Sequence, residues 1–283
     1  MNSLALDLGG TKIEVCRVIN NQKARLLKKY PTDRKIVGTP LFLTELKKII
    51  NKHLTAQDKK ICLASKGLVS KGKLLKTSLF GQDNFPLAEI LTKEFKRPCF
   101  VENDVVCMAL AENQLGQATK AQSFILLNLG TGLRLAFIHN GQLINGFNNQ
   151  AGEISLLKAP GLAGGLEKGV SGNGLTNIYQ KITKQKKSAK EILTAAKQDK
   201  NAQQAIKIFQ KRLADLLTAI SLFYNPELIV IDGSLKKSAN KFLPQAQKIY
   251  QAQTGKPFHF RKIEISHLQY SACLGAVMAS LKK

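Results

Sequence analysis

A glycine-tipped hairpin near the N-terminus carries the residues whose types and spacing best suit chemistry. An apolar run ends at Asp7, turns through Gly9, Gly10 and Thr11, and continues as a second, alternating run. Glycines have no Cβ, so their backbone N–H groups can approach a ligand closely, and phosphate is the ligand that such a turn suits best. Asp7 could hold a divalent cation there. The pattern predicts a phosphate site, with a plain tight turn as the alternative.

Two better-known phosphate loops do not fit this segment. The dinucleotide fingerprint and the P-loop both run from a strand into a helix. Here Ile13, Val15 and Val18 alternate with Glu14 and Arg17, which is typical of a strand. The turn therefore joins two strands.

The same pattern returns about 120 residues later, a spacing too long for a solenoid repeat. An apolar run reaches Asn128, passes through the turn Gly130-Thr131-Gly132, and continues as a second apolar run. We therefore expect two similar lobes, each offering a phosphate hairpin to a shared cleft.

Three further segments hold polar residues where ligands could bind. Asn103 and Asp104 stand where a predicted strand gives way to a helix, so Asp104 could accept a hydroxyl proton, or the pair could cap the helix. Glu153 and Glu167 lie in a Gly-rich stretch and could bind sugar hydroxyls, or could be exposed loop carboxylates. Gly233 follows a strand and could admit a nucleotide base, or form a plain turn.

Composition limits the class of protein. The chain has 283 residues and 44% hydrophobic residues, enough for one large domain or two ordinary ones. No apolar run is long enough for a transmembrane helix, and Asp7 interrupts any signal-peptide core early, so we expect a cytoplasmic protein without membrane contact. The five cysteines are scattered, which predicts reduced, buried thiols.

The net charge of +24 raises the question of a polyanionic partner. Lysines are spread along the whole chain, and aromatic residues make up only 6%, with no Trp. Stacking platforms for single-stranded nucleic acid are therefore scarce. The excess of positive charge allows polyphosphate as a partner if the basic side chains line one groove.

Helical and strand periodicities place these segments in two lobes. The N-terminal α/β lobe spans residues 1–116 and the C-terminal α/β lobe spans residues 117–283, with the tail helix 271–283 expected to pack back on the first lobe. The patterns predict strands at 60–64, 99–102 and 228–231 and helices at 41–54, 87–95, 105–115, 187–200, 202–224 and 271–281.

Taken together, the segments resemble the ROK group of bacterial sugar kinases and sugar-responsive repressors along nearly the whole chain. The resemblance implies an α/β, two-lobed actin/hexokinase-like (ribonuclease-H-like) fold with the nucleotide and sugar in a cleft between the lobes. It rests on these runs, which occur in the family's order: Asp7-Leu-Gly-Gly-Thr-Lys12, Pro86-Leu-Ala-Glu89, Val101-Glu-Asn-Asp104, Leu129-Gly-Thr-Gly132, Ala151-Gly-Glu153, Gly165-Leu-Glu167 and Asn225-Pro-Glu-Leu-Ile-Val-Ile-Asp-Gly233.

The resemblance implies a role for each matched residue. Asp104 matches the family's general base toward the acceptor hydroxyl. The matched sugar ligands are Asn103, Glu153, Glu167 and Gly67. The matched ATP-phosphate and Mg²⁺ residues are Asp7, Gly9, Gly10, Thr11, Lys12, Gly130, Thr131 and Gly132, with Asp7 acting on Mg²⁺ through the phosphates and Gly233 on the adenosine side.

The chain also departs from the family pattern. The family has a His that serves both the sugar and a structural zinc, and Leu156 stands in its place. The three zinc cysteines align with Lys158, Pro160 and Gly165, so we expect no zinc. The glycines Gly161 and Gly164 persist, which favours an unchanged path for the loop.

Two cations stand where the family has small residues. Lys66 replaces a Pro; we expect its ammonium to extend to solvent, and if it instead faces the cleft it favours an acidic sugar. Arg134 follows the second turn and is expected to point to solvent or to crowd the phosphate.

The sequence therefore predicts an ATP- and Mg²⁺-dependent kinase that phosphorylates a hexose, glucose or a relative, at the 6-hydroxyl. Two alternatives stay open: a catalytically weak or inactive sugar or nucleotide sensor on the same fold, and a polyphosphate-dependent sugar kinase. Repressor members carry an N-terminal helix-turn-helix, and here the first hairpin begins at residue 3, so we expect no DNA-binding domain. A homodimer is the expected assembly.

Overall fold

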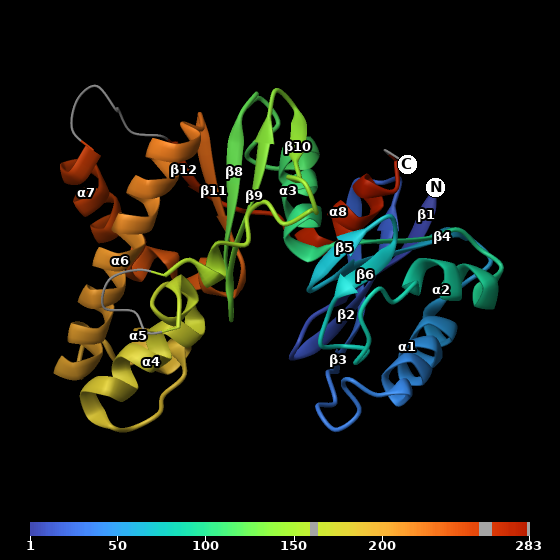
Figure 1. Cartoon of the computed structure of the whole chain (residues 1–283), viewed down its shortest axis with the longest axis horizontal. Helices are drawn as coiled ribbons and strands as arrows, with labels where there is room; N and C mark the ends of the chain where they lie inside the picture. The colour runs from blue at the N-terminus through green and yellow to red at the C-terminus, as the bar shows by residue number, and fades with distance from the viewer. Residues whose placement is uncertain (159–163, 255–261, 282–283) are drawn as a thin grey trace. The chain divides into compact units, whose positions relative to one another are not determined.

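The computed structural model describes residues 1–158, 164–254 and 262–281 (Figure 1). The chain divides into two compact units. The first combines residues 1–119, 145–151 and 267–283, and the second combines 120–144 and 152–266. Besides the N-terminal stretch, the first unit therefore holds a short central segment and the C-terminal end, which includes the helix expected to pack back on the first lobe.

The first unit is built on a five-stranded sheet with the order β3-β2-β1-β4-β7. The strands β1, β2 and β3 form an antiparallel meander, and β1, β4 and β7 run parallel. Their bounds are β1 Asn2–Leu8, β2 Lys12–Ile19, β3 Lys23–Pro31, β4 Asp58–Ser65 and β7 Cys99–Asn103. A separate two-stranded ribbon joins β5 Leu68–Ser70 to β6 Lys73–Lys76.

Helices cover both faces of this sheet, because β1 has apolar residues on both of its faces. Leu4, Leu6 and Leu8 pack against α1 (Pro40–His53) and α2 (Leu87–Phe95). Ala5 faces the opposite way, toward α3 (Asp104–Leu115) and α8 (Ser271–Ala279). Asp7 lies two residues after Ala5 in the same strand, so its side chain points to the same face of the sheet, the α3–α8 side.

The second unit repeats the same sheet plan in the order β10-β9-β8-β11-β12. Again a three-stranded antiparallel meander is followed by two parallel strands. The bounds are β8 Phe124–Leu129, β9 Leu133–His139, β10 Gln142–Ile144, β11 Leu228–Asp232 and β12 Lys262–Ile265. This match between the sheets confirms the internal repeat predicted from the two glycine turns.

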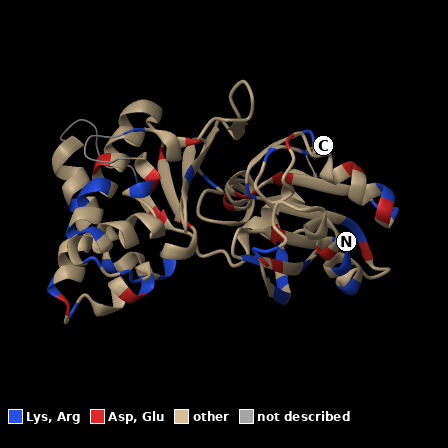
Figure 2. Cartoon of the chain, turned by 60° about the horizontal axis from the view of Figure 1, so that its bottom comes forward, with Lys and Arg blue, Asp and Glu red and all other residues tan. Residues whose placement is uncertain are grey.

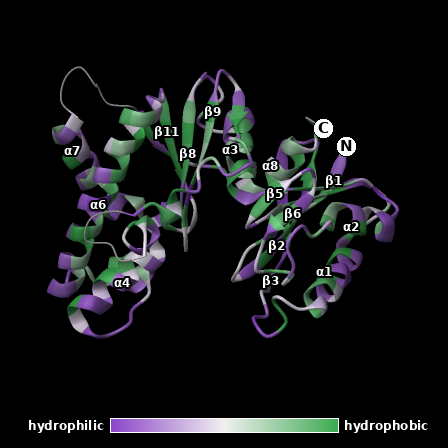
Figure 3. Ribbon diagram, in the orientation of Figure 1, coloured by the Kyte–Doolittle hydropathy of each residue, from purple (hydrophilic) through white to green (hydrophobic). Residues whose placement is uncertain are grey.

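The helices of the second unit cover the sheet face formed by alternate residues of β8 and β11. Figure 3 shows the apolar strands and the polar outer faces of the helices. Between β10 and β12 the chain forms η1 Ile154–Leu156, η2 Leu166–Lys168, α4 Gly172–Thr183, α5 Ala189–Ala195, α6 Lys200–Tyr224, η3 Ser234–Lys241 and α7 Leu243–Thr254.

Most expected elements occur within one or two residues of their predicted bounds, and the helix expected at 187–200 is the exception. The structure ends α5 at Ala195 and begins α6 at Lys200. The Asp199 carboxylate accepts hydrogen bonds from the N–H groups of Asn201 and Ala202, so it caps a new helix at this point. Within the described ranges no helix has the length and apolarity needed to cross a membrane.

Candidate phosphate and sugar site

Three parallel strands of the first unit end at the same level and bring the candidate residues together. The register pairs Leu8 of β1 with Ser65 of β4, and Ser65 with Asn103 of β7. The residues that follow these ends are therefore neighbours: the β1–β2 turn, Lys66 and Asp104. The carboxyl edge of the parallel strands is where open α/β sheets place ligands.

The β1–β2 turn is closed by its own backbone and supported from β3. The Gly9 N–H donates to the Lys12 carbonyl at 3.0 Å. Thr32 braces both sides of the turn, because its N–H donates to the Thr11 carbonyl at 3.0 Å and its hydroxyl donates to the Gly9 carbonyl at 2.9 Å. The tip, Gly10 and Thr11, stays exposed. Sequence reasoning missed Thr32, whose only signal is a hydroxyl directly after a strand.

Lys12, an expected phosphate ligand, is held by a carboxylate. Its ammonium lies 2.7 Å from Glu14 Oε1, and Lys29 reaches the same oxygen at 2.7 Å. Burial raises the pKa of Glu14, but the hydrogen bonds and charges of the two lysines outweigh this and lower it below its ordinary value. Glu14 is therefore ionised at neutral pH and retains both lysines.

Asn103 is the N-cap of α3. Its Oδ1 accepts hydrogen bonds from the N–H groups of Val105 and Val106, at 2.9 Å and 3.1 Å. Its amide nitrogen donates to the Gly67 carbonyl at 2.8 Å, which ties the end of β7 to the segment after β4. Asn103 is only 2% exposed. The capping alternative for Asn103 is therefore confirmed, and its contact with a sugar stays a prediction.

Asp104 occupies the first helical position of α3, directly after this cap. Its carboxylate accepts a hydrogen bond from the Val105 N–H at 2.9 Å. A carboxylate at a helix N-terminus is stabilised in its charged form by the helix dipole. A general base needs this charged form, so the position suits the predicted role.

The β8–β9 turn of the second unit is also closed by its own backbone, and it is one residue shorter than the first turn. The Gly130 N–H donates to the Gly132 carbonyl at 3.1 Å. The start of α4 packs directly on this turn, because the Gly172 N–H donates to the Gly130 carbonyl at 2.8 Å. Thr131, at the tip, is exposed.

Gly233 approaches the base of this second turn so closely that a side chain would not fit. Its φ is +97°, and a Cβ there would lie 2.6 Å from the Leu129 carbonyl carbon and closer still to Asn128 Oδ1. Gly233 also follows Asp232, whose carboxylate pairs with Lys236 at 2.7 Å. The strand end of β11 is therefore placed beside the phosphate turn by a contact that only glycine allows.

The carboxylate of Glu167, an expected sugar ligand, lies on the second turn. Its Oε2 accepts a hydrogen bond from the Leu133 N–H at 3.2 Å, and a Cβ on Gly132 would approach that oxygen to 2.6 Å. The structure therefore brings Glu167 to the glycine turn of its own unit. Its contact with sugar hydroxyls stays a prediction.

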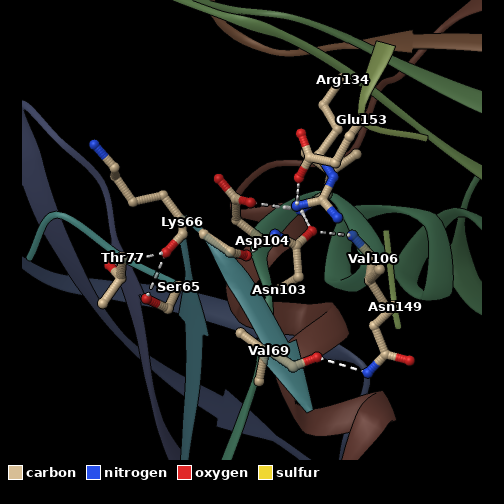
Figure 4. A network of polar contacts seen from close by, with 12 residues as sticks. Ser65, Lys66, Val69, Thr77, Asn103, Asp104, Val106, Arg134, Asn149 and Glu153 are labelled. Atoms are coloured by element: carbon tan, nitrogen blue, oxygen red, sulfur yellow. Dashed lines mark hydrogen bonds and ion pairs between the residues drawn. The ribbon is translucent and has the colours of Figure 1, made fainter. Parts of the chain in front are cut away.

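Glu153 has a cationic partner that the sequence did not indicate. The Arg134 guanidinium lies 3.0 Å from Glu153 Oε1 (Figure 4). Arg134 is 8% exposed, so the expectation that it points to solvent is wrong. Arg134 lies on β9, which bonds to the segment leading to Glu153 through the Leu135 N–H and the Gly152 carbonyl at 3.1 Å. This contact explains the pairing.

The loop around Leu156 holds no metal cluster among its described residues. Leu156 is 79% exposed in η1, and Lys158 and Gly165 supply no thiolate. Pro160 and Gly161 lie outside the described residues. Over the described ranges no group of three or more His, Cys, Asp or Glu side chains could hold a metal ion. The absence of zinc stays a prediction.

The five cysteines are buried and unpaired. Burial raises the pKa of Cys62 to about 11 and that of Cys99 to about 12, so both are protonated thiols at neutral pH. This agrees with the expected structural role and gives these two thiols no nucleophilic character.

The sequence pattern of the ROK family matches residues 3–283. The chain belongs to the ROK family. A glucokinase of Halalkalibacterium halodurans is 27% identical, over 88% of this chain and 85% of that protein. An N-acetylmannosamine kinase of Escherichia coli is 27% identical over 98% of both chains. The ROK glucokinase of Streptomyces griseus, solved with glucose and AMPPNP, superposes with a TM-score of 0.85 at 18% identity over 100% of both chains.

The superposition confirms the expected actin/hexokinase-like fold of this ROK chain. The two turns also fit nucleotide phosphates on their own geometry, because each has an exposed tip and a closed backbone base. A Cβ on Gly9 would lie 2.9 Å from the Lys12 carbonyl, so the first turn requires its glycine. The roles of individual residues toward ATP, Mg²⁺ and sugar stay predictions.

Proposed function

We propose that this chain is a hexose kinase that transfers the γ-phosphoryl group of ATP to the 6-hydroxyl of its sugar. The observation that carries the proposal is the pair of matching glycine turns, one at the corresponding strand end of each sheet. Asp104 adds a carboxylate at a neighbouring strand end of the first sheet. Two phosphate turns and one base are the parts that phosphoryl transfer to an alcohol needs.

Each residue of the first unit has a defined task in this proposal. Asp104 accepts the proton of the attacking hydroxyl, and Asn103 fixes the start of α3 so that Asp104 is presented in one position. The tip amides of Gly10 and Thr11 donate to phosphate oxygens. Asp7 would hold Mg²⁺ through the phosphates, and the cation would neutralise charge that develops on the transferred group.

We assign further binding groups to the second unit. The Gly130-Thr131-Gly132 turn binds phosphate, and Gly233 admits the adenosine beside it. Glu153 and Glu167 bind sugar hydroxyls through oxygens not used by Arg134 and Leu133. Arg134 limits how Glu153 can turn, so we expect it to influence which sugar is accepted.

A transfer assay tests the proposal: ADP release is followed when ATP is the donor, and the sugar phosphate itself is measured when polyphosphate is the donor. It uses glucose, mannose, N-acetylmannosamine and N-acetylglucosamine, with ATP or polyphosphate as the donor and with Mg²⁺ present or chelated. We expect Mg²⁺-dependent turnover of at least one hexose with ATP, and a product whose phosphorus couples to the C6 protons in NMR spectra.

Other outcomes separate the alternatives. Turnover with polyphosphate alone would replace ATP as the donor. Sugar binding without turnover under any donor would support the sensor and overturn the kinase. Figure 2 shows Lys and Arg on helices and strands of both units, so the positive charge is not confined to one segment, and we therefore favour ATP over polyphosphate.

A further inference from the structure

Lys66 directs its ammonium at the first phosphate turn. Its backbone N–H contacts the Leu8 carbonyl at 3.4 Å, so it emerges from β4 beside the end of β1. A Cβ built on Gly10 would lie 3.3 Å from Lys66 Nζ and 3.7 Å from its Cδ. Figure 4 shows this side chain extended away from Asn103 and Asp104. The ammonium therefore lies over the tip of the turn and does not point toward the predicted base.

The charge environment of Lys66 differs from that of the other lysine at this turn. No carboxylate among the described residues lies within ion-pair distance of the Lys66 ammonium. Lys12 belongs to the turn by sequence, yet its ammonium is bound to the nearly buried carboxylate of Glu14. Separating Lys12 from Glu14 costs free energy, because a buried carboxylate is stabilised by its partners.

We propose that Lys66, rather than Lys12, is the side chain that binds a phosphate of ATP at the β1–β2 turn. An ammonium carries three N–H donors and a full charge, and it forms stronger hydrogen bonds with phosphate than neutral groups do. Lys66 adds this charge where the tip amides of Gly10 and Thr11 are exposed. The inference rests on the proposed kinase function and assigns one of its phosphate ligands.

Gly10 leaves room for the Lys66 ammonium over the turn. A Cβ at 3.3 Å from Lys66 Nζ is tighter than ordinary van der Waals contact. Gly10→Ala would therefore displace the ammonium from the tip without changing its charge. Gly10→Ala therefore tests the position of the Lys66 ammonium, whereas Lys66→Met tests whether an ammonium is needed at all.

Equilibrium binding tests the proposal without relying on turnover. The ligands are Mg²⁺–AMPPNP, which carries the phosphates, and adenosine, which carries none. Lys66→Met keeps the apolar stem and removes the ammonium. We expect the Kd for Mg²⁺–AMPPNP to rise about tenfold to hundredfold, as for loss of a hydrogen bond to a charged group. We expect the Kd for adenosine to stay within twofold, and Lys66→Arg to recover most of the loss.

Matched variants separate this effect from a change in net charge or folding. Lys73→Met removes an exposed lysine from β6 in the same unit, and we expect no change in either Kd. Lys12→Met should weaken Mg²⁺–AMPPNP binding less than Lys66→Met does, and Gly10→Ala should weaken it in the same direction as Lys66→Met. Thermal unfolding of each variant shows whether it remains folded.

The possible failures are distinguishable. If the parent protein binds neither Mg²⁺–AMPPNP nor adenosine, with or without sugar, the kinase proposal fails and this assignment fails with it. If the parent binds Mg²⁺–AMPPNP and Lys66→Met stays within twofold, only the assignment of Lys66 is overturned. The assignment of Lys66 is also overturned if Lys12→Met raises the Kd for Mg²⁺–AMPPNP more than Lys66→Met does. It is overturned too if Lys66→Met raises the Kd for Mg²⁺–AMPPNP and for adenosine by the same factor.

Discussion

At the scale of single residues, charge pairing decides which candidate side chains can meet a ligand. Glu14 retains Lys12, and Arg134 lies against Glu153, so two expected ligands already have partners of opposite charge. Lys66 has no such partner among the described residues and extends to the turn. The residue types alone do not reveal this division, because pairing depends on side chains brought together by the sheets.

Asp104→Asn should abolish phosphoryl transfer and leave sugar binding and folding intact. The amide cannot accept the hydroxyl proton, and a positioned base contributes about 10²- to 10⁴-fold in rate. The helix start is kept, because Asn103 supplies the cap. The measurements are kcat in the ADP-release assay, the Kd for the sugar, and Tm. A kcat within tenfold of the parent would remove Asp104 from the mechanism.

Glu14 should make the stability of the protein depend on acidic pH. Its pKa is lowered in the folded state, so its contribution is fully present above its ordinary value near 4.5 and is lost as the pH falls through the folded-state pKa. Glu14→Gln lacks this contribution. Urea unfolding of both proteins at neutral pH and at about pH 3 should show the larger loss in the parent. Equal losses in the two proteins would contradict the prediction.

At the scale of elements, the site depends on strand ends and on turns that tolerate no side chain. In each sheet a glycine turn joins the first two strands of the meander, and a parallel neighbour ends beside it. The junction of β11 with the second turn leaves no room for a side chain, because Gly233 packs on the backbone of Leu129. Substitution there should disturb a whole edge of the sheet.

Gly233→Ala should destabilise the protein and weaken nucleotide binding. Positive φ costs a side chain about 1–3 kcal/mol, and the clash with Leu129 adds to this. Gly141→Ala is the matched control in the same unit, since its φ is also positive, at +71°, and nothing lies within 4 Å of the new Cβ. Urea unfolding should show a clearly larger loss for Gly233→Ala. If Gly233→Ala and Gly141→Ala lose similar amounts of unfolding free energy, the positive φ alone explains the loss and the clash with Leu129 contributes nothing.

At the scale of the whole molecule, a net charge of +24 is carried by a chain with only 19 acidic residues. Surface ion pairs such as Lys47–Glu94, Lys93–Glu89 and Lys262–Glu264 join single partners and neutralise few of the lysines, so much of the positive charge repels itself. Such repulsion acts over the Debye length, which salt shortens from about 10 Å at 0.1 M to about 3 Å at 1 M.

Raising NaCl from about 0.1 M to about 1 M should therefore raise Tm. Screening removes more repulsion between lysines than it removes attraction within the few surface ion pairs. Differential scanning calorimetry at both salt concentrations measures the shift. A fall in Tm would show that the ion pairs outweigh the repulsion.

The purified protein should contain well under one zinc per chain. Leu156, Lys158 and Gly165 cannot ligate zinc as the family's His and Cys residues do, and Pro160, the remaining matched position, has no metal-binding side chain. Elemental analysis of protein prepared without chelators tests this. A stoichiometric zinc that survives dialysis would mean that residues 152–167 were matched to the family incorrectly.

Local patterns in the sequence were sufficient to predict both glycine turns, the strand-to-helix step at Asn103 and the long helix α6. Each depends on residues close together in the chain: a glycine without a Cβ, a capping side chain, or an apolar stripe of helical period. The internal repeat followed from the same patterns. Helix α4 was missed because it begins within a Gly-rich stretch that reads as a loop.

Only the tertiary structure decided which charges meet. Lys66 reaches Gly10 because β4 runs parallel to β1 in a particular register, and Arg134 reaches Glu153 because β9 bonds to the segment at Gly152. Residues 145–151 join the first unit by packing that no local pattern specifies. Such contacts join positions far apart in the chain, so their energies depend on the folded sheets and not on neighbouring residues.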